Sequence, residues 1–440
     1  MPAEPEPESE PASADGGPAY GSRPDRAAKG AAPRWGGGRR RIVAAAVAAL
    51  VAAAITTGVL VSAGHHDAST GNRHPLAADG LRHTPVDASP GSCGRGWGGP
   101  GKVTPRSGTQ VFDLHNSSAS ATDVDLIDPH TGKVYGEVEG LAPAGSRPMV
   151  VDLGSGTYAF KCLQEDTDAV TGPTVTVPGT APRGPAGLPV TEHDLIPPTL
   201  AYQTWIGTRM AELVGDTGAL KEDVDRGDLA AARRDWLAGH LVYERMGAAY
   251  DTFGDADGVI NGTTAIGRDP LKDPDFTGFH RIEYGLWHGE SAKSLRGQAA
   301  TLDKAVRALR ATWSTQRMDP MAMGLRAHEI IENAEQFELT GRTDYGSGTN
   351  LATARANIDG TREILGKLNS LLVPRDTGLA ALNAALDRAA ADLDAQHHDG
   401  RWTPLGDLTR AQRERIDADF GDLLERLAPV AAIFDVRRTA

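Results

Sequence analysis

A histidine and a glutamate three positions apart form the pair in this sequence whose types and spacing suit metal chemistry. His280 and Glu283 lie in residues 273–287, which read DPDFTGFHRIEYGLW. On a helix, this spacing places both side chains on one face, with Cβ atoms roughly 5–6 Å apart. An imidazole and a carboxylate at that separation can bind one metal ion. An isolated His-x-x-Glu is more often a solvated hydrogen-bonded pair.

A helix must position this pair. Asp275 or Thr277 can cap its N-terminus, and residues 279–287 then form its first turns. Aromatic side chains on both sides of the pair are expected to bury this helix and to limit water around the pair. These side chains are Phe276, Phe279, Tyr284 and Trp287.

The whole string resembles the GxHxxE signature of the imelysin-like family, specifically its EfeO/EfeM-type iron-uptake branch. Residues 242–245 (VYER) and 357–360 (NIDG) resemble two further family segments. The resemblance runs from about residue 195 to the C-terminus and implies a helical domain that binds iron outside the cytoplasm. It also implies two partners from the same uptake system, an iron permease and a haem peroxidase.

The resemblance also implies ligands on other helices, because Glu244, Glu332, and Asp255 or Asp257 match family positions. A second family glutamate is replaced here by Gly247. The predicted metal site therefore comprises His280, Glu283, Glu332, Asp255, Glu244 and Asp257. One imidazole with several carboxylates suits iron, with zinc or manganese possible in vitro, better than copper(I). Without a cation, the clustered carboxylates should have raised pKa values, and cation binding should stabilise the fold.

Two other functions are open. Imelysin-like proteins have been classed as metallopeptidases because of the HxxE motif. A zincin places a glutamate directly after its first histidine and a second histidine one turn later, where this chain has Arg281 and Tyr284. Binding is therefore preferred to hydrolysis, and no catalytic residue is predicted. The second alternative is a polysaccharide-binding surface module whose aromatic side chains stack on sugars.

Length and charge narrow the class of protein further. The 440 residues exceed one ordinary core, so two domains with tails are expected. A net charge of −13 argues against nucleic-acid binding and suits a protein that collects cations. The chain has only two cysteines, which excludes a zinc-finger arrangement and permits one disulfide.

The N-terminal part predicts a membrane segment. Residues 1–41 are low in complexity and read as a disordered cytoplasmic tail, and residues 42–63 are uncharged and long enough to cross a bilayer. The preceding arginines stay inside, so the rest lies outside the cell. The segment is either an anchor in the cell membrane or a signal peptide cleaved near residue 63, which would release a secreted protein. Residues 64–91 are a linker whose histidines, His65, His66, His74 and His83, are incidental.

Residues 92–180 predict a small all-β domain. Short alternating segments separated by turn residues indicate a sandwich that resembles a cupredoxin-like domain. These segments are residues 110–114, 123–127, 149–153, 156–161 and 174–177. No histidine or methionine shortly follows Cys162, so a blue-copper site is rejected. By resemblance, Cys93 and Cys162 either form a disulfide or bind a soft metal with Asp125.

The rest of the chain, residues 195–440, predicts an imelysin-like helical bundle. A proline- and glycine-rich linker at 182–189 precedes it. Helical periodicity then marks residues 229–250, 293–314, 318–340, 350–372, 376–397 and 407–430. The fold class is therefore mainly α, with a small β domain and a transmembrane helix ahead of the bundle.

Overall fold

A computed structural model describes residues 80–98, 102–164 and 167–436. The predicted cytoplasmic tail, the predicted membrane segment and most of the predicted linker lie outside these residues. None of the helices in the described ranges is both long enough and apolar enough to span a bilayer.

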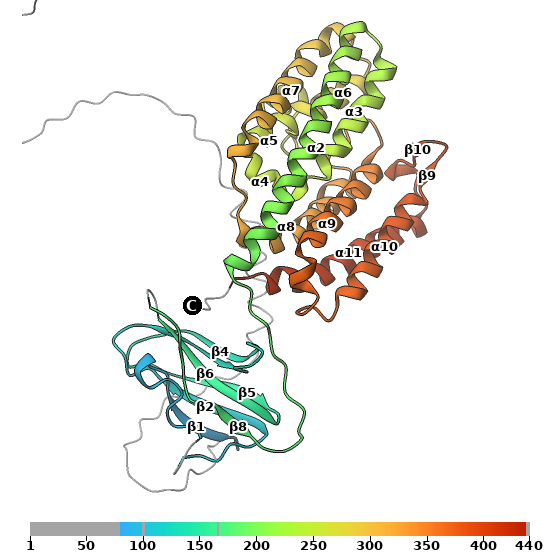
Figure 1. Cartoon of the computed structure of the whole chain (residues 1–440). Helices are drawn as coiled ribbons and strands as arrows, with labels where there is room; N and C mark the ends of the chain where they lie inside the picture. The colour runs from blue at the N-terminus through green and yellow to red at the C-terminus, as the bar shows by residue number, and fades with distance from the viewer. Residues whose placement is uncertain (1–79, 99–101, 165–166, 437–440) are drawn as a thin grey trace, which may run out of the picture. The chain divides into compact units, whose positions relative to one another are not determined.

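The β domain consists of two sheets around one core (Figure 1). In the first, β1 pairs in parallel with β2, and β2 pairs antiparallel with β5. In the second, the strand order is β4-β3-β6-β7, and β8 also pairs with β6. The strands are β1 Arg82–Asp87, β2 Gly108–His115, β3 Thr122–Ile127, β4 Val134–Leu141, β5 Ser146–Leu153, β6 Gly156–Gln164, β7 Val170–Thr171 and β8 Val175–Val177.

The two cysteines form a disulfide within the core of this domain. The sulfurs of Cys93 and Cys162 are 2.07 Å apart, and both residues are buried. Closing a loop across a sequence separation of 69 stabilises the fold by about 4 kcal/mol in the entropic description. Neither sulfur is a free thiolate in this state. Asp125 is also buried, on β3 opposite Lys161 of β6.

The β domain begins earlier than the sequence predicts. Residues 82–87, assigned above to the linker, form β1. Its histidine, proline and aspartate residues are uncommon in strands, so the sequence pattern does not predict one. An edge strand nevertheless tolerates a proline, because one side of it needs no hydrogen-bond donor. His83, interpreted as incidental, lies on β1 with its Nδ1 3.0 Å from the Asp113 carboxylate. The likeness to cupredoxins stays a prediction.

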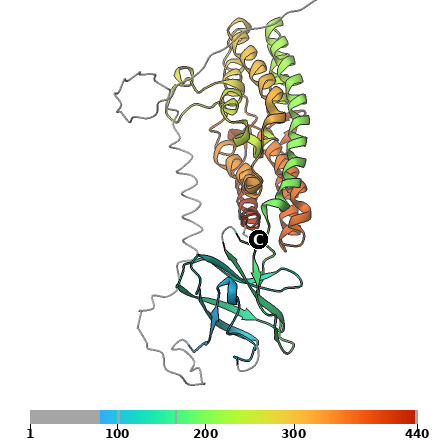
Figure 2. The same ribbon diagram turned by 60° about the vertical axis from the view of Figure 1, so that its left-hand side comes forward.

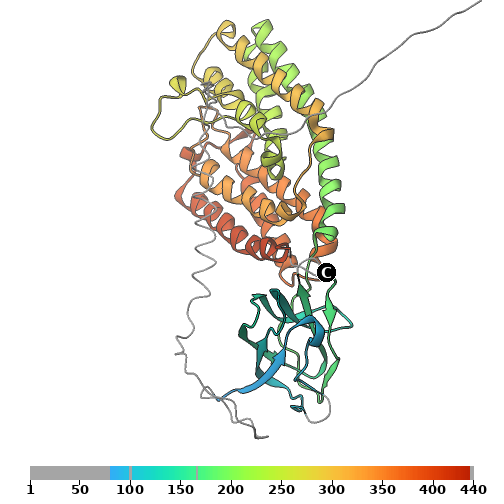
Figure 3. The ribbon, with the colours of Figure 1, turned by 90° about the vertical axis from the view of Figure 1, so that its left-hand side faces the viewer.

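The C-terminal part is a helical bundle, as predicted. Its long helix α2 packs against α3 and α7 (Figures 2 and 3). The helices are α2 Glu192–Arg226, α3 Leu229–Glu244, α4 Tyr250–Phe253, α5 Asp255–Ile260, α6 Gly278–Trp287, α7 Ala292–Thr312, α8 Met323–Asn333, α9 Asn350–Leu372, α10 Leu379–Asp394 and α11 Arg410–Ile433.

The helical segments depart from the predicted boundaries in three places. The helix predicted over 229–250 ends at Glu244, and a 3-10 turn precedes α4. The helix predicted over 318–340 becomes α8 followed by a π-helical turn, Ala334–Glu338. Two short strands, β9 His397–His398 and β10 Arg401–Trp402, pair around a turn at residues 399–400 that apolar periodicity does not reveal.

Candidate functional site

The predicted pair is buried on α6. His280 and Glu283 are 2% and 1% exposed, so they are not a solvated surface pair. The distance from His280 Nδ1 to Glu283 Oε2 is 3.6 Å, longer than a hydrogen bond. Within the described ranges, Nδ1 of His280 has no hydrogen-bond partner. A buried imidazole nitrogen without a partner costs free energy, and a bound cation would remove that cost.

Neighbouring segments fix the start of α6. Thr277 holds the capping position, but its hydroxyl donates to the Gly258 carbonyl at 2.8 Å and caps nothing, contrary to prediction. The Trp236 indole N–H on α3 donates to the Phe279 carbonyl at 2.8 Å. These bonds hold α6 against its surroundings directly beside His280.

A loop before α9 holds the carboxylate of Glu283. The backbone N–H groups of Tyr345 and Ser347 donate to Glu283 Oε1 at 3.0 and 3.1 Å. Burial alone would raise the pKa of Glu283, but His280 and the Ser347 amide outweigh burial and lower it. The carboxylate is therefore ionised at neutral pH, with Oε2 directed toward His280.

Glu244, at the end of α3, joins the same buried group. Its Oε1 accepts from Asn261 Nδ2 at 2.9 Å, and its Oε2 accepts from Asn357 Nδ2 at 3.1 Å. His240, one turn earlier, has Nε2 3.2 Å from Glu244 Oε1. Burial opposes ionisation of both groups, but their mutual attraction raises the pKa of His240 and lowers that of Glu244.

A third buried carboxylate belongs to Glu338, the last residue of the π-helical turn. It accepts hydrogen bonds from the Thr343 hydroxyl and from Asn350 Nδ2, the latter at 2.9 Å. Burial, and then the charge of Glu244, raise the pKa of Glu338 to about 7. π-Helical turns often occur at functional sites.

This raised pKa predicts how the stability of the metal-free protein depends on pH. The unfolded Glu338 carboxyl ionises near its ordinary pKa of 4.5, whereas the folded one keeps its proton until about pH 7. Between these values the native state binds more protons, so its contribution to the free energy of unfolding falls as pH rises. Urea unfolding at several pH values should show a smaller fall for Glu338→Gln. Glu335→Gln, in the same turn but half-buried, should keep the wild-type dependence. Equal slopes for all three proteins would contradict this assignment.

The six predicted ligands differ in where they lie. His280, Glu283 and Glu244 are buried together, and electrostatic interactions join Glu244 to His280. Asp257 accepts a hydrogen bond at 2.6 Å from the hydroxyl of Tyr243, the residue that precedes Glu244. Asp255 is exposed at the start of α5. Glu332 contacts His328 and Gln336 on its own helical segment.

Sequence reasoning overlooked the contributions of His240, Glu338, Asn261 and Asn357. The His240–Glu244 pair has the i, i+4 spacing of helical neighbours, so this signal was present. Glu338 follows a change of helical register, and no 3.6-residue pattern predicts its direction.

The donors suit a metal ion, although they do not converge on one point. Among the described residues, no three His, Cys, Asp or Glu side chains are arranged to hold a metal. Imidazole nitrogens and carboxylate oxygens are nevertheless the donors that iron, zinc and manganese use. The unpaired nitrogen of His280 fits such an ion, since no hydrogen bond must break for it to turn.

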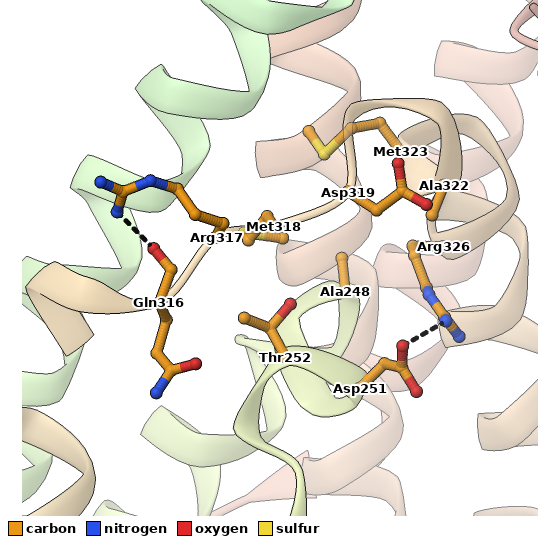
Figure 4. Close-up of a pocket in the computed structure, with 10 residues that line it drawn as sticks. All are labelled: Ala248, Asp251, Thr252, Gln316, Arg317, Met318, Asp319, Ala322, Met323 and Arg326. Carbon is orange, nitrogen blue, oxygen red and sulfur yellow. Dashed lines mark hydrogen bonds and ion pairs between the residues drawn. The ribbon is translucent and has the colours of Figure 1, made fainter. Parts of the chain in front are cut away.

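The cavity drawn in Figure 4 is a different place. It measures about 310 Å³ and includes the Arg326–Asp251 ion pair, with N and O 3.1 Å apart. Its lining contains none of the buried His, Glu or Asn residues described above. Because His280 and Glu283 are 2% and 1% exposed, an ion needs a local opening to reach them.

Comparisons with known proteins identify the family of the helical domain. The imelysin family model, Peptidase_M75, matches residues 199–430, more than half of the chain. The iron uptake system component EfeO of Yersinia pestis is 27% identical over 336 residues, which cover 76% of this chain and 88% of that protein. EfeO of Escherichia coli K12 is 25% identical over 339 residues, with the same shares covered. Because the family model covers more than half of the chain, this chain belongs to the imelysin family, and the two relatives identify it as a distant homologue of EfeO.

Proposed function

We propose that this protein is the extracytoplasmic metal-binding component of an iron-uptake system, which captures iron on its helical bundle and passes it to a membrane permease. The observation that supports this most is the buried group of His280, Glu283 and Glu244, in which an imidazole nitrogen lacks a partner. Burying two ionised carboxylates beside imidazoles is costly unless a cation offsets their charge. The names of the EfeO relatives support iron as the cargo.

Within this proposal, His280, Glu283 and Glu244 are the principal ligands. Glu332, Asp255 and Asp257 stay predicted ligands from the family resemblance. The Cys93–Cys162 disulfide supports a location in an oxidising, extracytoplasmic compartment. Anchoring through residues 42–63, a haem peroxidase partner and a cupredoxin-like β domain stay predictions as well.

Anaerobic titration of the purified protein with Fe²⁺, beside Zn²⁺ and Mn²⁺, tests this function by calorimetry. We expect saturable binding in the micromolar range or tighter, and no cleavage in a parallel assay with chromogenic peptides. A protein that binds none of these ions would refute the proposal. Peptide cleavage that requires Glu283 would instead support the metallopeptidase alternative.

A further inference from the structure

We infer that His240 and Glu338 are ligands of the same centre, so that one divalent transition-metal ion is held between two imidazoles and buried carboxylates. This inference rests on the proposed function and goes beyond it, because neither residue belongs to the HxxE motif or to the predicted ligand set. It changes the donor set from one nitrogen with oxygens to two nitrogens with oxygens.

His240 is the first observation that supports this inference. It is 3% exposed, and neither of its ring nitrogens has a well-directed hydrogen bond within the described part of the chain. Its ring stacks on Trp236, with centroids 5.1 Å apart. Packing therefore holds the ring, with Nε2 3.2 Å from the Glu244 carboxylate and with Nδ1 lacking a hydrogen-bond partner in the described ranges. A buried polar atom without a partner normally has a specific reason.

The second observation is the position of His240 beside His280. Their ring centroids are 5.4 Å apart, and the ring planes are inclined by 76°. Two imidazoles bound to one tetrahedral ion, with metal–nitrogen distances near 2.1 Å, have centroids about 5 Å apart. The observed spacing between the ring centroids thus suits one ion shared by His240 and His280.

The carboxylate of Glu338 is held by the same helix as that of Glu244. Asn350 of α9 donates to Glu338, and Asn357, two turns later on α9, donates to Glu244. The charge of Glu244 raises the pKa of Glu338, and the charge of His240 lowers it by less. Its two oxygens accept hydrogen bonds from the Thr343 hydroxyl and the Asn350 amide, so two neutral donors orient the carboxylate. Outer hydrogen bonds of this kind orient metal-binding carboxylates in known sites.

The donor set indicates which ions the site prefers. Imidazole favours zinc, iron, copper and nickel, whereas sites built from carboxylates alone suit magnesium, calcium and manganese. Two imidazoles should therefore reject magnesium and calcium and favour zinc or ferrous iron over manganese. Removal of one imidazole should weaken zinc binding more than manganese binding.

Calorimetric titration of the full chain with Zn²⁺ and Mn²⁺ tests the inference. His240→Gln should weaken zinc binding at least tenfold and manganese binding by less, and Glu338→Gln should weaken both. X-ray absorption of the zinc-loaded protein should count two imidazole ligands in the wild type and one in His240→Gln. His397→Gln, at an exposed hairpin, should leave both affinities unchanged. Leu220→Ala, in the core of α2, should lower stability but keep the ratio of the two affinities.

The outcomes separate this inference from the proposed function. If His280→Ala loses binding while His240→Gln keeps both wild-type affinities, the inference is wrong and the proposed function stands. If the wild type binds no metal, both are wrong. If His240→Gln does not fold, two other results can still overturn the inference. One is a single imidazole ligand in the X-ray absorption spectrum of the wild type, and the other is unchanged metal affinity in Glu338→Gln.

Discussion

His280→Ala is expected to reduce the affinity for iron and zinc by about a hundredfold or more, the largest effect of any substitution at the site. His280 is buried on α6, and its Nδ1 lies beside the Glu283 carboxylate without a hydrogen-bond partner in the described ranges. Loss of outer partners of metal ligands typically costs about 10–100-fold in affinity, so loss of a ligand should cost at least as much. Calorimetry with Fe²⁺ under anaerobic conditions measures the change.

Two further variants show whether such a loss reflects the ligand or the fold. Glu283→Gln keeps an oxygen that can accept the Tyr345 and Ser347 amides, so it should fold, yet it should also lose most of the affinity because the charge is gone. His288→Ala removes an exposed imidazole at the end of the same helix, stacked on Tyr284 with centroids 4.0 Å apart. It should bind metal like the wild type. Wild-type affinity in both His280→Ala and Glu283→Gln would exclude this pair from the site.

The sequence predicted the parts of the site that depend on local spacing. His280 and Glu283 lie on one helix, so their common face follows from the helical repeat. Glu244 was predicted as a ligand because a short segment resembles the family, and it is also buried. The helical bundle itself followed from apolar periodicity, which is strong in the long amphipathic helix α7.

What sequence reasoning missed depends on contacts between distant segments. The two amides that hold Glu283 belong to the backbone of residues 345 and 347, and a backbone amide leaves no signature in residue types. Asn357 was noticed only as part of a family segment, yet it donates to Glu244 across 113 positions of sequence. The direction of the Glu338 side chain depends on the π-helical turn, which inserts one residue into the helical repeat.

Asp255 and Glu332 stay predicted ligands, and what the structure describes of them is local to α5 and α8. Both were chosen from matching positions and not from packing. Asp255 begins the short helix α5, where an exposed carboxylate interacts favourably with the helix dipole. Glu332 lies one turn from His328 on α8, with Nδ1 and Oε2 3.7 Å apart. Each side chain has a local structural role, and its part in metal binding stays a prediction from the matching position.

Gly278→Ala should destabilise the helical bundle by more than about 3 kcal/mol, because two independent costs add at this position. Gly278 begins α6 with φ +60°, a left-handed conformation that costs other residues about 1–2 kcal/mol. A Cβ here would also lie 1.9 Å from the carbonyl oxygen of Ile260, so the backbone must shift. The shift would displace His280, two residues later, and metal affinity should fall together with stability.

Gly289 provides the matched control for this prediction, because it shares the first cost but not the second. It follows the C-terminus of the same helix with φ +75°, and a Cβ at this position meets no atom within 4 Å. Gly289→Ala should therefore lose only about 1 kcal/mol and keep its metal affinity. Urea unfolding of the three proteins, combined with zinc titration, measures both quantities. If the two alanine variants unfold alike, the close contact between Gly278 and Ile260 does not position His280, and the burial of the pair has another cause.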